Sequence, residues 1–164
     1  MATTLQEARR SHGPTRLNEV TARPFLSGYL ANGFKEDDLV LESVLFEHEA
    51  IRGEFRVDSF FCPGDGIFHL SATMAFNCIG QVGIVYASLD NGFDRKPGEI
   101  YQTDLRMIFR KPIRAVRFPV RLNLVQKRSK QHSVRYRMHG SIGDDCFLVD
   151  SEFTVPVTAH ADLS

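Results

Sequence analysis

Two polar residues stand inside the longest apolar stretch of the chain, which runs from Gly66 to Gly92. His69 lies near its start and Asn77 lies further along. Apolar side chains recur around them at three- and four-residue steps, which predicts a buried helix from about His69 to Leu89. On such a helix the two side chains would share nearly one face, with a rise on the order of 12 Å between them. We therefore expect both to be polar groups held inside the fold.

The chemistry open to these two residues is acid–base chemistry and hydrogen bonding. At a helix N-terminus the dipole favours a neutral imidazole, and a neutral His69 is a competent general base at pH 7. Its alternative role is to cap the helix or to bind a loop carbonyl. The Asn77 amide can hold a water molecule or donate to a developing oxyanion. Its alternative role is to satisfy a carbonyl group in the core.

Backbone donors near the predicted helix start form a second kind of site. The amides from Phe68 to Ser71 would lie at the positive end of the helix and bind a carbonyl oxygen or an oxyanion. Gly64 and Gly66 would let the backbone approach such a ligand. Ser71 is expected to cap the helix rather than to act as a nucleophile, because no GxSxG motif surrounds it.

The elements that must position these groups follow from the periodicity of the chain. Residues 1–16 are polar and predict a mobile tail, and residues 17–164 predict one domain. Residues 17–30 have mostly helical spacing, which Pro24 divides. The runs 39–48 and 50–60 then predict two antiparallel strands, with Ile51, Phe55 and Val57 on one face of the second.

The C-terminal half predicts further strands in succession. The first covers residues 100–113. The later ones carry apolar side chains on one face, namely Phe118, Val120, Leu122 and Leu124, then Val134, Tyr136 and Met138, and finally Phe147, Val149, Phe153, Val155 and Val157. Turn residues at 128–132 and 143–145 separate them as a meander.

Composition limits the class of protein. The formal net charge is zero, which argues against non-specific binding to nucleic acid or to a membrane surface. The three cysteines show no CxxC spacing, so neither a disulfide framework nor a zinc site is predicted, and Cys62 and Cys78 are expected to be inert core thiols. With no apolar leader evident in residues 1–16, we expect a cytoplasmic protein without a metal or an organic cofactor.

Two strands, one long helix and a run of antiparallel strands predict an α+β fold in which one sheet curls around the helix. Asn77 and Gln81 interrupt the helix, and its flanks alternate like soluble strands, so no membrane span is expected. The curled sheet would leave one edge and part of its apolar surface uncovered. A second copy would cover them, and we expect a homodimer or a dimer of dimers.

The order of elements, together with the motifs GIFHLSATMAFNCIGQ (residues 66–81) and FRKP (residues 109–112), resembles the hotdog-fold acyl-thioester proteins. Within them the chain is similar to the FcoT-type long-chain fatty acyl-CoA thioesterases, over about residues 26–157. The firmest anchors are Phe76-Asn77, inside the predicted helix, and the FRKP motif, which is expected on a strand.

The resemblance implies active-site roles for Asn77 and for Tyr29, which fall on an Asn and a Tyr of that family. Tyr29 has packing as its alternative role. A second family Asn follows Gly-x-Phe, and in this chain His69 stands at its position. The family also has a Tyr in the loop before the helix, which has no counterpart here; Phe61 is among the nearest residues. The implied substrate-binding residues around the helix start are Gly66, Phe68, Leu70, Ser71 and Phe61.

Basic residues along and after the first C-terminal strand form a candidate patch for an anionic carrier. Arg110 and Lys111 would receive the phosphates of coenzyme A or the acidic surface of an acyl carrier protein. For any single one of these residues, a solvated sheet face is the alternative.

The leading hypothesis is a thioesterase that hydrolyses a fatty or modified acyl thioester of coenzyme A or of an acyl carrier protein. A 3-hydroxyacyl-thioester dehydratase or isomerase with His69 as its base is the first alternative. A non-catalytic acyl-binding protein is the second, since the fold alone does not select the reaction.

Overall fold

The computed structural model describes residues 38–60, 64–93 and 100–156. The elements are β1 (Asp38–Glu47), β2 (Ala50–Ser59), α4 (Ala72–Asp90), β3 (Tyr101–Phe109), β4 (Arg117–Lys130), β5 (Ser133–Ile142) and β6 (Phe147–Pro156). The predicted tail, Tyr29 and Phe61 lie outside the described residues, so the domain limits and the roles of these two side chains stay predictions.

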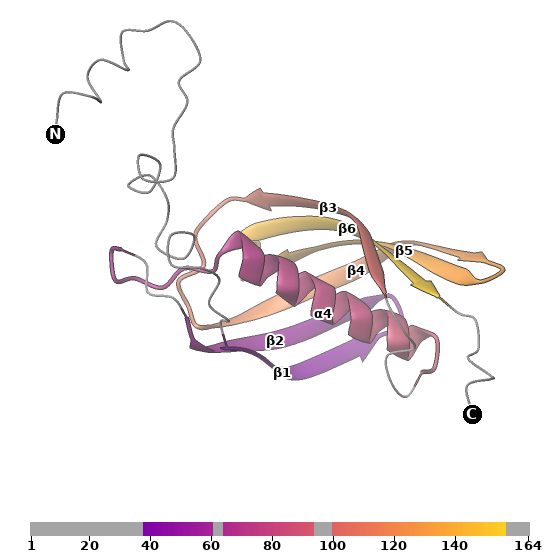
Figure 1. Ribbon diagram of the computed structural model, residues 1–164, viewed down its shortest axis with the longest axis horizontal. Helices are drawn as coiled ribbons and strands as arrows, with labels where there is room; N and C mark the ends of the chain where they lie inside the picture. The colour runs from indigo at the N-terminus through magenta and orange to yellow at the C-terminus, as the bar shows by residue number, and fades with distance from the viewer. Residues whose placement is uncertain (1–37, 61–63, 94–99, 157–164) are drawn as a thin grey trace, which may run out of the picture. The chain divides into compact units, whose positions relative to one another are not determined.

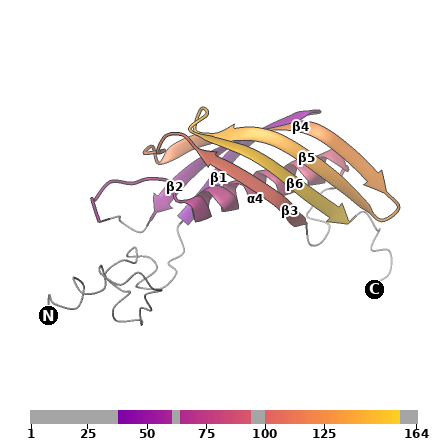
Figure 2. The same ribbon diagram turned by 90° about the horizontal axis from the view of Figure 1, so that it is seen from above.

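The strands form one six-stranded antiparallel sheet in the order β1-β2-β4-β5-β6-β3. Figures 1 and 2 show the sheet arching over one side of α4. The α+β hotdog fold expected from the sequence is confirmed. The predicted meander holds for β4, β5 and β6, but β3 lies beyond β6 at the edge, so the chain crosses from that edge back to the middle of the sheet before β4.

Alternation along the strands builds the core. On β2 the side chains of Ile51, Phe55 and Val57 are buried while the charged residues between them face outwards, as predicted. The same alternation holds on β5 and β6. The helix approaches closely at Gly83, where an added Cβ would overlap the ring of Phe153. A glycine is therefore required there for α4 to lie against the sheet.

The helix is buried on one side only, which corrects the expectation of burial almost all round. Phe76 is 47% exposed, and Asn77 and Gln81 are exposed as well. By length and composition α4 would suffice to cross a membrane, with a mean hydropathy of 1.3 over 18 residues, but a core helix meets the same criterion. In this chain its buried side packs on the sheet, with Met74, Ile79, Val82 and Tyr86 in the core.

Candidate active site

The helix begins three residues later than predicted, because Ser71 caps it. The Ser71 hydroxyl accepts a hydrogen bond from the Met74 amide at 3.2 Å, and α4 starts at Ala72. The predicted capping role of Ser71 is confirmed. His69 therefore precedes the helix, and the helical rise predicted between His69 and Asn77 was wrong.

The segment before the cap is extended, with alternate side chains turned inwards. Phe68 and Leu70 are buried, whereas Ile67 and His69 are exposed. The Leu70 amide donates to the Ile113 carbonyl at 2.9 Å, which fixes this alternation. The prediction that His69 is held inside the fold was wrong: its imidazole lies at the surface, directly before a helix N-terminus.

Only part of the predicted amide cluster is free to bind a ligand. The Leu70 amide is engaged by Ile113, and the amides of Met74 and Ala75 donate to the Ser71 hydroxyl and carbonyl. In the part of the chain that the structure describes, the amides of Ala72 and Thr73 have no hydrogen-bond partner. Of the predicted amides, from Phe68 to Ser71, only that of Leu70 is engaged within the described residues, and the helix N-terminus adds the amides of Ala72 and Thr73 slightly later in the chain.

Asn77 lies on the exposed side of the helix rather than in the core. The prediction that its side chain is held inside the fold was therefore wrong. Asn77 is exposed, and it stands one helical turn beyond Thr73 on the same face. Phe76 beside it adds an exposed apolar surface. Asn77 is thus placed along the same helix face as one of the free amides.

The loop before this segment has the geometry that its glycines predict. Gly66 has a φ of 71°, which favours glycine. The Asp65 carboxylate accepts a hydrogen bond from the Ile67 amide at 3.0 Å and closes the turn. Gly66 thereby directs the chain into the extended segment that carries His69.

Arg110 and Lys111 follow β3 instead of lying within it, so the expectation that FRKP is on a strand holds for Phe109 alone. Their amides donate to the Cys146 carbonyl at 2.8 and 3.2 Å. The same loop continues to Ile113, which binds Leu70. Both cations are exposed, and neither has a carboxylate within ion-pair distance among the residues of the described ranges.

The cysteine prediction is confirmed where it is described. Cys78 is fully buried in α4, and burial raises the pKa of its thiol to about 12, so it is not a nucleophile at neutral pH. Cys62 lies outside the described residues. Within the described ranges, no group of three or more His, Cys, Asp or Glu side chains has a geometry that would hold a metal ion.

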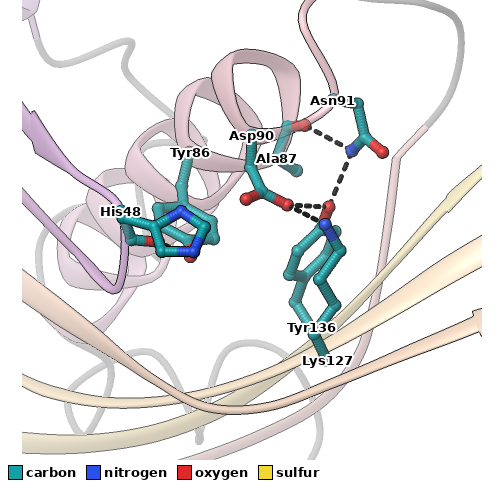
Figure 3. A network of polar contacts seen from close by, with 7 residues as sticks. All are labelled: His48, Tyr86, Ala87, Asp90, Asn91, Lys127 and Tyr136. Carbon is teal, nitrogen blue, oxygen red and sulfur yellow. Dashed lines mark hydrogen bonds and ion pairs between the residues drawn. The ribbon is translucent and has the colours of Figure 1, made fainter.

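A polar cluster at the other end of α4 was missed from the sequence (Figure 3). Asp90 Oδ2 accepts hydrogen bonds from the Tyr136 hydroxyl and from Lys127 Nζ, each at 2.6 Å. Asn91 Nδ2 donates to the Tyr136 hydroxyl at 2.7 Å and to the Ala87 carbonyl at 2.6 Å. The Asp90 side chain is 5% exposed, so these contacts satisfy a largely buried charge.

Two buried tyrosines complete this helix C-terminal cluster. The Tyr86 hydroxyl donates to the His48 carbonyl at 2.9 Å, and its ring meets that of Tyr136 edge to face. Burial, and then the charges of Asp90 and Glu49, raise the pKa of Tyr86 to about 12. Burial, and then the hydrogen bond to Asp90, raise the pKa of Tyr136. Tyr136 lies at an inward strand position, and a buried tyrosine hydroxyl there needs a hydrogen-bond partner. This requirement was the sequence signal that could have revealed the cluster.

Comparisons with known proteins agree on the fold. No protein-family model matches the sequence, and no curated protein sequence does. Among solved structures, the chain is similar to a thioesterase from Haemophilus influenzae, with 10% identity, a TM-score of 0.50, and 90% of this chain and 97% of the other covered.

Two further structures show the same similarity. One is a conserved protein of Pseudomonas aeruginosa, with 10% identity, a TM-score of 0.50, and 73% and 89% of the two chains covered. The other, a candidate thioesterase of Lactococcus lactis, has 7% identity, a TM-score of 0.51, and 72% and 93% covered. At such identities the similarity establishes that this chain has the hotdog fold.

Proposed function

We propose that this protein is a thioesterase that hydrolyses an acyl thioester at the N-terminal end of α4. The observation that carries the proposal is the pair of amides at Ala72 and Thr73, which have no hydrogen-bond partner among the described residues, with the exposed His69 just before them. The thioesterase from H. influenzae, which is similar in structure, supports the choice of reaction.

The proposed reaction needs one base and one oxyanion site. His69 removes a proton from water, and the resulting hydroxide attacks the thioester carbonyl carbon. The amides of Ala72 and Thr73 stabilise the negative oxygen of the tetrahedral intermediate. When the C–S bond breaks, the thiolate takes the proton from the imidazolium, and the products are a free thiol and a carboxylic acid, which releases its proton to solvent. Asn77, on the same helix face as Thr73, positions the water.

The proposed substrate is a fatty acyl group on coenzyme A or on an acyl carrier protein. The exposed ring of Phe76 suits an acyl chain, and Tyr29 and Phe61 are proposed to contribute from outside the described residues. Arg110 and Lys111, held beside the His69 segment through Ile113 and free of ion pairs in the described ranges, suit an anionic carrier. The proposed setting is the cytoplasm, and the proposed assembly is a homodimer.

The assay that tests the reaction uses saturated and 3-hydroxyacyl thioesters of several lengths. Release of free thiol is expected, together with a fatty acid and without a change in enoyl absorbance. Enoyl formation without thiol release would replace hydrolysis by dehydration. Binding of the thioesters without turnover would leave only an acyl-binding protein.

The carrier is tested by reversing one cation. Lys111→Glu is expected to raise KM for an acyl-CoA several-fold and to leave KM for the matching N-acetylcysteamine thioester unchanged, because that substrate has no phosphates. Lys130→Glu, at the far end of β4, is the matched control. An equal change with both substrates would contradict a phosphate contact.

A further inference from the structure

The charges of the chain are unevenly distributed along its sequence. The formal net charge is zero, yet residues 105–143 contain eleven of the twenty Lys and Arg residues and no Asp or Glu. This segment supplies the whole of β4 and β5, which are neighbours in the sheet. The fold therefore brings together two strands that carry cations and no carboxylate.

Four arginines of these strands lie on the face of the sheet that points away from α4. Arg121 and Arg128 belong to β4, and Arg135 and Arg137 belong to β5. All four are exposed, and the residues that alternate with them on β5 are buried. Figure 2 shows β4 and β5 side by side in the sheet, with α4 on its other face. We call these four side chains the outer-face arginines.

Three of the outer-face arginines stand directly opposite another arginine. Arg121 is opposite Arg52 of β2, and Arg128 is opposite Arg135. Side chains at such positions share a face of the sheet, with Cβ atoms about 4.5 to 5.5 Å apart, and like charges there are destabilising. Positive charge is thus concentrated along β4, and an anion bound over these side chains would offset the repulsion.

The chain itself neutralises only part of this charge. Arg135 is bound to the Glu152 carboxylate at 3.4 Å. Arg121, Arg128 and Arg137 belong to no ion pair in the described part of the chain. Arg137 lies opposite Glu152, but that carboxylate is the one bound to Arg135. Three unpaired guanidinium groups on one face indicate an anionic partner, because guanidinium forms strong hydrogen bonds with carboxylate and phosphate oxygens.

The outer-face arginines form a strip along β4 and β5, and the width of this strip limits the kind of partner. Acidic side chains border it on both sides, namely Glu54 on β2 and Asp150 and Glu152 on β6. Two neighbouring strands cover a width of about 10 Å, since their axes lie about 4.8 Å apart, and an α-helix with its side chains has a diameter of roughly 10 to 12 Å. A broader anionic surface, such as a membrane, would meet the acids as well. The strip therefore suits a narrow acidic element.

The side chains in and beside the strip favour a protein over nucleic acid. Single strands bind through aromatic side chains on which their bases stack, and the Phe and Tyr residues of β4 and β5, which are Phe118 and Tyr136, are buried. Leu45 is 59% exposed and lies opposite Arg52, in the same cross-strand row as Arg121. An exposed apolar side chain beside a cation is typical of a surface that binds another protein.

We propose that the outer-face arginines bind an acidic α-helix of a partner protein, which lies along β4 and β5. Arg121 and Arg128 are separated along β4 by on the order of 20 Å, a distance that a helix spans in about four turns. Carboxylates on one face of that helix would reach Arg121, Arg137 and Arg128 in turn. The strip lies on the opposite side of the sheet from α4, so the inference does not rest on the reaction proposed at the helix N-terminus.

A synthetic helix tests the proposed occupant. The probe is an end-capped peptide of about 20 residues, built of alanine and glutamine with glutamate at every fourth position, so that the glutamates share one face. The control peptide has the same composition but spreads its glutamates around the helix, and circular dichroism checks that the two are equally helical. Fluorescence anisotropy with the full chain at low salt is expected to give binding at least about fivefold tighter for the probe. Equal binding of the two peptides would overturn the proposal.

Charge changes test the arginines themselves. Arg121→Glu and Arg137→Glu are each expected to weaken binding of the probe about tenfold. Arg121→Gln removes the charge without adding an acid, and it is expected to weaken binding about threefold. Arg114→Glu, which changes an exposed cation in the loop before β4, is the matched control and is expected to stay within about twofold of the parent chain. Circular dichroism checks that each variant is folded. Folded strip variants that bind like the parent chain, or a control that loses as much as they do, would contradict the strip.

Other polyanions are tested as competitors. Unlabelled probe peptide, a single-stranded oligonucleotide and vesicles of anionic lipid are each added to the complex of the chain with labelled probe, at equal concentrations of negative charge. The peptide is expected to displace the labelled probe most effectively. Stronger displacement by the oligonucleotide or by the vesicles would overturn the acidic helix as the occupant and assign the strip to that ligand instead.

Discussion

At its C-terminal end α4 is tied to the sheet by side chains, whereas at its N-terminal end it is held mainly by the backbone. The helix C-terminal cluster of Asp90, Asn91, Lys127 and Tyr136 is internally hydrogen-bonded around the buried Tyr136 and the largely buried Asp90 side chain. Before the N-terminus, the Leu70–Ile113 bond anchors the chain. The amides of Ala72 and Thr73 stay unbonded within the described residues.

This difference separates a structural site from a candidate site for chemistry. An acid at a helix C-terminus is opposed by the helix dipole, so the Asp90 charge requires Lys127 and the Tyr136 hydroxyl. Those contacts leave little capacity for a ligand. Unbonded amides at the opposite end cost some stability and keep their capacity to bind an oxygen. The raised pKa values of Tyr86 and Tyr136, a kind of shift that is often read as a sign of function, occur here at the structural end.

The largest expected effect is on the structural end. Asp90→Ala leaves Lys127 and the Tyr136 hydroxyl without their acceptor, and it is expected to lower the free energy of unfolding by about 3 kcal/mol. Urea denaturation measures this loss, and Glu47→Gln, on the exposed end of β1, is the control. Activity per folded molecule is expected to stay within about threefold. A loss of activity as large as that expected for a variant of the candidate site would contradict a purely structural role for Asp90.

The matching change at the candidate site is His69→Ala. It is expected to lower kcat about 100-fold, which corresponds to about 2.7 kcal/mol in activation free energy. Because the side chain is exposed, the melting temperature is expected to stay within a few degrees. Thiol release and thermal denaturation measure the two quantities, with His132→Ala in the exposed β4–β5 turn as the control. Full activity in His69→Ala would remove its role as the base.

A smaller effect is expected from the Ser71 cap, which stabilises the helix and lies at the candidate site. Ser71→Ala removes the acceptor of the Met74 amide and is expected to cost about 1 kcal/mol of stability. Ser71→Asp keeps an acceptor at this position and is expected to restore the stability. Chemical denaturation of both variants compares them. If Ser71→Ala abolishes thiol release at full stability, the hydroxyl acts in the reaction rather than as a cap.

The smallest effect is the titration of the two tyrosines, which does not occur at neutral pH and becomes measurable in alkali. A phenol ionises near pH 10 in an unfolded chain, whereas the pKa of Tyr86 is raised to about 12 and that of Tyr136 is raised as well. The folded state then holds protons that the unfolded state releases. Their contribution is therefore complete below pH 10 and declines as the pH rises from 10 towards 12.

Tyr136→Phe is expected to make this alkaline decline shallower. Denaturation midpoints at pH 9, 10 and 11 measure the slope, and Tyr101→Phe, which changes an exposed phenol, is the control. An unchanged slope in Tyr136→Phe would mean that the phenol does not keep its proton in the folded chain.

Period-two alternation made most of the strands predictable, since one buried face dictates it. The position of β3 was not predictable in this way, because periodicity identifies a strand and not its neighbour. The helix start was missed because Leu70 and Met74 have helical spacing. A hydrogen bond to the distant Ile113 makes Leu70 extended instead.

The candidate site was predictable as a region and not in its geometry. The residues around the helix start were identified, and Ser71 was assigned correctly as the cap. The burial of His69 and Asn77 was predicted wrongly, because an apolar run shows that a helix packs and does not show which side packs. The Asp90 contacts join residues far apart in the sequence, so local pattern could not reveal them.

The order of the strands also has a consequence during synthesis. β3 pairs with β6, the last strand of the described chain, so β3 leaves the ribosome well before its partner exists. In that interval its apolar side chains and backbone groups are available to other chains. A chain ending before residue 147 would lack β6, and β3 would then have no pairing strand among the described elements.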